Sequence, residues 1–118
     1  MTKRRATQLD VDEVRALDHW CHLLRCMFPT TVGVIHVGSS IIRPDYRDVD
    51  IRVVLLDDEY QALVPLINRL DLHMLLSQWG RRMTGLRIDC QLQSVTESSE
   101  QHDKIEDGAF PRARGHLL

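Results

Sequence analysis

The chain of 118 residues contains no apolar run of the roughly 18 residues that a transmembrane helix needs, so we expect no membrane association. It has only three cysteines and no Cys-x-x-Cys pair, which predicts reduced thiols and argues against a zinc site. Its formal net charge is −2, without the basic excess of a strong nucleic-acid binder. No apolar segment of secretory type follows its first five residues. These absences together predict a cytoplasmic protein.

Length and composition favour one domain with one core, because 43% of the residues are apolar and 27% are charged. We expect a single domain over residues 1–118, with a core of about 10–95 and a tail of about 96–118. The changes of hydrophobic period predict the order helix, strand, short helix, strand, helix, strand. This order is typical of an α/β (α+β) fold with a small mixed sheet packed against helices.

Two helices have recognisable ends. Asp10 and Glu13 form a capping-box pattern, and the apolar positions that follow predict a helix that ends before Pro29. A second helix is expected from Pro65 to about Arg82, with Pro65 in its first turn. Its predicted apolar face includes Leu66, Leu70, His73 and Leu76.

The most informative segment is the predicted strand that begins at Asp48. Because side chains of a strand alternate between its faces, Val49, Ile51 and Val53 share one face. Asp48 and Asp50 share the other. Two neighbouring carboxylates repel each other unless a cation neutralises them, and such ligands suit Mg²⁺.

A third carboxylate repeats the pattern on the predicted strand from Leu86 to Val95. Asp89 lies on the polar face of this strand, opposite to Ile88 and Cys90. If the two strands pair, Asp89 joins Asp48 and Asp50 on one open sheet face. Because Asp is disfavoured in strands, three of them on one face favour a metal site over simple solvent exposure.

The turn at Gly38 and Ser39 follows a buried strand. Glycine allows close backbone approach, and free N–H groups at the start of a short helix bind phosphate. Ser40 either shares this role or caps the helix, and Arg43 is the nearest basic residue. We interpret His36 as a core residue.

These motifs resemble the nucleotidyltransferase superfamily related to DNA polymerase beta, and more closely its small minimal members of bacterial and phage type. The matching residues are Val37-Gly38-Ser39, Asp48-Val49-Asp50-Ile51 and Ile88-Asp89-Cys90. The similarity extends over about residues 10 to 93. The gap from Ser39 to Asp48 is at the short end of the family's range.

The resemblance implies a nucleotidyltransferase that moves a nucleoside monophosphate from a triphosphate such as ATP to a hydroxyl of a protein, an RNA or a small molecule. Asp48, Asp50 and Asp89 would bind Mg²⁺ or Mn²⁺ and act as the catalytic residues. Gly38, Ser39, Ser40 and Arg43 would bind the triphosphate. Arg52 and Arg87 are interpreted as structural or solvated ion-pair residues. The expected location is the cytosol of a bacterium or a phage-infected host.

Two alternatives remain open at this point. The same fold serves as a nucleotide-binding, antitoxin-like module that acts through a protein partner, and the short chain leaves a homodimer or a separate partner open. A plain interaction domain with fortuitous acidic residues would show no metal affinity.

Overall fold

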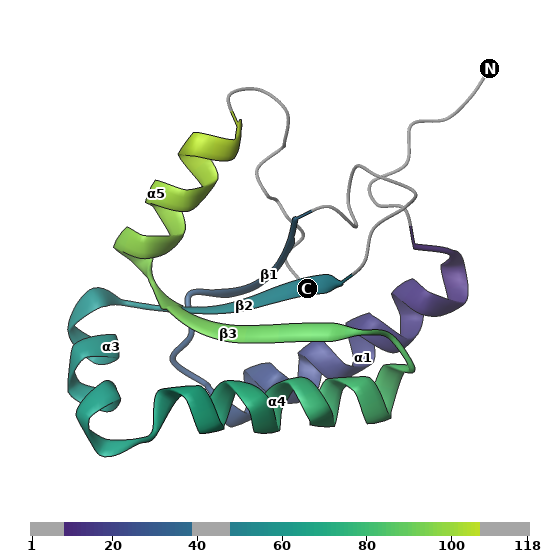
Figure 1. The fold of residues 1–118 in the computed structure, drawn as a ribbon, viewed down its shortest axis with the longest axis horizontal. Coiled ribbons are helices and arrows are strands. Elements are labelled where there is room, and N and C mark those ends of the chain that lie inside the picture. Colours follow the sequence, from purple (N-terminus) through teal and green to yellow (C-terminus); the bar gives the residue numbers. More distant parts are fainter. Residues whose placement is uncertain (1–8, 39–47, 107–118) are drawn as a thin grey trace.

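The computed structural model describes residues 9–38 and 48–106. The first half contains α1 (Val11–Met27), β1 (Gly33–Val37) and β2 (Val49–Leu55). The second half contains α3 (Asp57–Leu63), the 3-10 helix η1 (Val64–Leu66), α4 (Arg69–Thr84), β3 (Ile88–Ser94) and α5 (Val95–Glu106). Figure 1 shows these elements in colours that follow the sequence.

The sheet has the order β1-β2-β3. β1 pairs with β2 in the antiparallel sense, and β2 pairs with β3 in the parallel sense, with α3, η1 and α4 in the connection. The predicted fold class, a small mixed sheet packed against helices, is confirmed. It is consistent with the nucleotidyltransferase-like architecture that the resemblance implies.

Helices α1 and α4 cover one face of the sheet, and α5 leaves the end of β3 on the opposite side (Figure 1). The core lies between the sheet and these two helices, because the apolar positions of β2 and β3 point toward them. Six of these side chains are at most 2% exposed: Val49, Ile51, Val53, Ile88, Cys90 and Leu92. The period of two in the sequence therefore predicts the core face of both strands correctly.

Helix α1 begins as predicted. The Asp10 side chain accepts from the Glu13 N–H at 2.8 Å, and the Glu13 carboxylate accepts from the Asp10 N–H at 2.9 Å. Trp20, fully buried on α1, packs edge-to-face on Trp79 of α4 with ring centroids 5.9 Å apart. A Cβ on Gly80 would come within 3 Å of the Trp20 ring, so the close approach of the two helices requires a glycine there.

The second predicted helix is corrected by the structure. Pro65 lies in η1 and not in α4, and the chain leaves helical geometry at Ile67 before Asn68 caps a new helix through the Asp71 N–H. The interruption shifts the phase of the apolar positions. Leu66 and Leu70, predicted on the buried face, are 80% and 73% exposed.

None of the helices within residues 9–38 and 48–106 has the length and apolar character that crossing a membrane requires.

Candidate functional site

The predicted acidic face is present in the sheet. Asp50 of β2 and Asp89 of β3 are direct partners in the parallel register, and both are half-buried. Asp48 directly precedes β2, two residues from Asp50, which places it on the same side. The three carboxylates therefore lie on the face opposite to the core, away from α1 and α4.

The charge on Asp50 is not fully compensated. Burial raises the pKa of its carboxyl group to about 6; Arg52 opposes this rise, while Asp89, Asp48 and a hydrogen bond with Asp89 add to it. Such a rise is expected where carboxylates share a partly desolvated place. A divalent cation would reverse this balance, because it would stabilise the charged form of Asp50.

Two arginines stand beside the other carboxylates. Arg52 Nη2 lies 3.7 Å from Asp89 Oδ2, and Arg87 Nε lies 3.7 Å from Asp48 Oδ1. The Arg87 side chain is 72% exposed, so its pairing is weak and easily exchanged. The Arg52 side chain is only 12% exposed, and its Nη1 also donates to the Ile51 and Asp89 carbonyl oxygens at 3.0 Å each. The interpretation of both arginines as ion-pair residues is supported.

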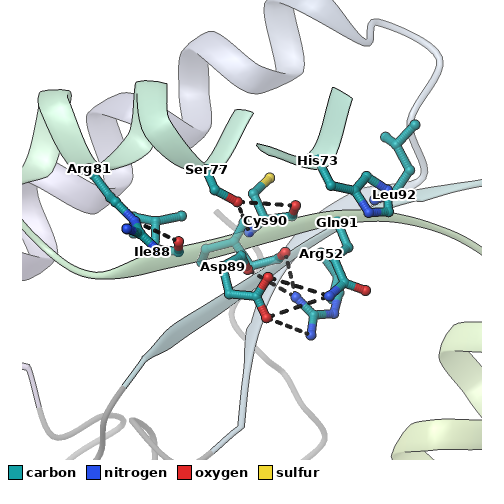
Figure 2. A network of polar contacts seen from close by, with 10 residues as sticks. Arg52, His73, Ser77, Arg81, Ile88, Asp89, Cys90, Gln91 and Leu92 are labelled. Atoms are coloured by element: carbon teal, nitrogen blue, oxygen red, sulfur yellow. Dashed lines mark hydrogen bonds and ion pairs between the residues drawn. The ribbon is translucent and has the colours of Figure 1, made fainter. Parts of the chain in front are cut away.

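Arg52 does more than the sequence indicated. Its guanidinium joins the main chains of β2 and β3 next to the carboxylates, and Figure 2 shows it beside the Asp89 carboxylate. Gln91, on the same face, donates to the Asp89 carboxylate at 3.3 and 3.5 Å. Arginine on an otherwise acidic strand face was the signal available in the sequence, but only the strand register identifies its acceptors.

Gly38 follows β1 with a φ of +88°, a conformation that glycine adopts without strain. A Cβ at this position would overlap the Asp50 carboxylate. The structure therefore explains the glycine by its contact with Asp50, which is additional to the predicted approach of a phosphate.

The other predicted triphosphate contacts, Ser39, Ser40 and Arg43, lie outside the described residues. His36 is 3% exposed and is the register partner of Ile51, with Val34 beside it on the buried face of β1. It therefore lies on the core side of the sheet, as expected, and not with the carboxylates.

The donor chemistry fits a hard divalent cation. Asp50 and Asp89 are adjacent in the register, and burial, to which the charges of Asp89 and Asp48 add, raises the pKa of Asp50. A cation would offset both effects, because it stabilises the charged carboxylate. Among the side chains that the structure describes, in residues 9–38 and 48–100, no three of His, Cys, Asp or Glu are grouped as a complete metal site. Asp48 would join such a site by exchanging its contact with Arg87 for the cation.

No protein-family model and no curated protein matches this chain. The chain is similar to a solved structure of a candidate nucleotidyltransferase from Sulfolobus solfataricus. The identity is 20%, the match covers 93% of this chain and 96% of the other, and the TM-score is 0.41. A similarity at this identity and TM-score does not establish an activity.

Proposed function

We propose that this protein is a metal-dependent nucleotidyltransferase, which moves a nucleoside monophosphate from a nucleoside triphosphate to a hydroxyl acceptor. One observation carries the proposal. Asp50 and Asp89 are register partners on the open face of the sheet, with Asp48 beside them, and the pKa of Asp50 is raised. Like charges are placed together at a cost to stability, which is typical of sites that bind a cation.

Asp48, Asp50 and Asp89 would hold Mg²⁺ or Mn²⁺, which would neutralise the triphosphate and bring the two reacting oxygens into line. The acceptor oxygen attacks the α-phosphorus, and the bond from that phosphorus to the bridging oxygen breaks, so that pyrophosphate leaves. Asp89 accepts the proton of the attacking hydroxyl. The acceptor, whether protein, RNA or small molecule, approaches from the face opposite to α1 and α4.

Arg52 places a positive charge on the face that carries the three carboxylates. Its guanidinium is held by two carbonyl oxygens, so it would remain beside Asp89 with a cation bound to the carboxylate. Its charge opposes the rise in the pKa of Asp50. We expect the positive charge of Arg52 to reduce the repulsion between this acidic face and the negatively charged triphosphate.

The test is a transfer assay. Each of the four α-labelled nucleoside triphosphates is incubated with the protein, millimolar Mg²⁺ and a bacterial lysate. The proposal expects label on protein, RNA or a small acceptor, and no label without Mg²⁺. Calorimetry adds the binding step: absence of Mg²⁺-dependent triphosphate binding in the wild type would reject the site. Asp48→Asn and Asp50→Asn are each expected to abolish that dependence.

A second candidate function is a nucleotide-binding module that acts through a protein partner. One observation favours it: apolar side chains of η1 and the first half of α4 are largely exposed, namely Leu66, Leu70, Met74 and Leu75. This candidate predicts triphosphate binding without label transfer. The same assay therefore separates the two functions.

A further inference from the structure

Helix α4 approaches β3 with three polar side chains in a row. His73, Ser77 and Arg81 are spaced four residues apart, which aligns them along one side of the helix. Figure 2 shows all three reaching the main chain of β3 on the side away from Arg52. They contact alternate residues of the strand, in the reverse order of the sequence.

The contacts are hydrogen bonds to the main chain of β3. Arg81 Nε donates to the Ile88 carbonyl at 3.3 Å. Ser77 Oγ accepts from the Cys90 N–H at 2.8 Å and lies 3.5 Å from the Cys90 carbonyl. His73 Nε2 accepts from the Leu92 N–H at 3.0 Å. Apolar packing of a helix on a strand does not require these hydrogen bonds. They therefore restrain the main chain of β3 in addition to the packing.

Two of these bonds enclose Asp89. The Ile88 carbonyl and the Cys90 N–H belong to the two peptide groups on either side of the Asp89 Cα, and α4 binds both. From the opposite side, Arg52 Nη1 donates to the Asp89 carbonyl at 3.0 Å. The main chain of Asp89 is therefore held from both sides, at the one β3 position whose carboxylate meets Asp50.

We propose that Ser77 and Arg81 are positioning residues, which act through the main chain of β3 to fix the Asp89 carboxylate against Asp50. This inference rests on the proposed transfer activity. A reacting group must be held within roughly 0.5 Å of its productive place. The Asp89 side chain is attached to the Cα between these two peptide groups. A small rotation of either peptide group therefore moves the carboxylate on the open face of the sheet.

The experiment compares Ser77→Ala with Ser77→Thr in the transfer assay. Ser77→Ala leaves the Cys90 N–H without its acceptor, and kcat is expected to fall about 10- to 100-fold, as for a small misplacement of a reacting group. The KM for the Mg²⁺–triphosphate complex should change by no more than about twofold, because Asp48 and Asp50 stay in place. Ser77→Thr returns the hydroxyl and should return kcat.

His73→Ala is the matched control. It removes a hydrogen bond from the same helix to the same strand, but at Leu92, three residues from Asp89. A loss of folding stability similar to that of Ser77→Ala is expected, with kcat within about twofold of wild type. If kcat falls equally in both variants, or only in proportion to the unfolded fraction, Ser77 has a merely structural role and the inference is wrong.

A second readout needs no activity. In carbon-13 NMR spectra, Ser77→Ala should shift the Asp89 carboxyl signal and accelerate exchange of the Cys90 amide, and Ser77→Thr should reverse both changes. An unchanged Asp89 signal in Ser77→Ala would overturn the inference. If the wild type transfers no label, the proposed function fails, and these spectra still decide whether Ser77 positions Asp89.

Discussion

Gly38 and Asp50 are in contact at the point where β1 ends, so that a Cβ on residue 38 would overlap the Asp50 carboxylate. The glycine has a φ of +88°. Two separate costs therefore oppose any side chain here: backbone strain and displacement of a carboxylate that we assign to the site.

Gly38→Ala and Gly85→Ala separate these two costs. Gly85 also has a positive φ, of +77°, but a Cβ there would meet nothing within 4 Å. Gly85→Ala should therefore lower the free energy of unfolding by about 1 kcal/mol from strain alone. Gly38→Ala should lower it by about 1–3 kcal/mol more, because overpacking adds to strain.

Urea denaturation of both variants measures this difference. In an Asp50→Ala background the additional cost at residue 38 should largely disappear, as a double-mutant cycle would show. Equal losses for Gly38→Ala and Gly85→Ala would mean that residue 38 does not constrain Asp50.

Asp50→Asn should stabilise the protein at neutral pH. The pKa of Asp50 is raised from 3.8 to about 6 in the folded state, mainly by burial. The folded state therefore binds this proton more tightly, and the associated stability is present below pH 3.8 and lost as the pH rises through about 6. Removing the charge should restore about 1–3 kcal/mol at pH 7–8, the lower value allowing for screening by solvent.

Thermal unfolding at several pH values checks this expectation. The difference between Asp50→Asn and the wild type should vanish below about pH 4. Millimolar Mg²⁺ should stabilise the wild type at pH 7–8 and leave Asp50→Asn unchanged. A variant that is less stable than the wild type at neutral pH would show that Asp50 is well compensated in the fold.

Asp89→Asn should separate binding from transfer. Asp48 and Asp50 remain to hold the metal and the triphosphate, whereas the group that accepts the proton of the acceptor is lost. We expect triphosphate affinity within a few-fold of wild type and a transfer rate lower by about 100-fold or more. Calorimetry and the label assay measure the two properties. Loss of triphosphate binding would instead place Asp89 among the residues that hold the nucleotide.

His73 should make part of the stability depend on pH. Burial, then Arg69 and Arg52, lower the pKa of its imidazole, whereas Asp89 and Glu97 act in the opposite direction. Its Nε2 accepts the Leu92 N–H, which a doubly protonated ring cannot do. The associated stability is present above the unfolded value of 6.5 and lost as the pH falls through the lower folded value.

His73→Gln keeps an acceptor at similar reach and removes the titration. Its loss of stability between pH 7.5 and 5 should be smaller than that of the wild type, measured with urea under matched conditions. NMR titration of the His73 ring provides the direct check. A ring pKa at or above 6.5 would contradict the expectation.

The sequence predicted the faces of the sheet because period-two alternation depends only on local geometry. Val49, Ile51 and Ile88 are buried, and Asp50 and Asp89 lie on the other face, as expected. The capping box at Asp10 was equally readable, since its two hydrogen bonds join residues three apart. The roles of the three aspartates in metal binding stay predictions.

Local sequence patterns did not predict where a helix is interrupted, or which residues distant in the sequence are in contact. Pro65 and Asn68 divide one apparent helix into two elements. The prediction that Leu66 and Leu70 lie on one buried helical face was therefore wrong. The Asn68 cap three residues before Asp71 was the available signal. The contact of Ser77 with Cys90 spans 13 residues and depends on the packing of α4 on β3, which no local pattern specifies.

His73, Ser77 and Arg81 of α4 also affect whether another chain can pair with β3. Among the strands that the structure describes, β3 is an end strand, and an end strand with free N–H and carbonyl groups is a template on which another polypeptide can add a strand. Here side chains of α4 already engage the Ile88 carbonyl, the Cys90 N–H and the Leu92 N–H. These contacts therefore leave fewer groups of β3 on which another strand could pair, and Ser77→Ala or His73→Ala would each release one main-chain N–H.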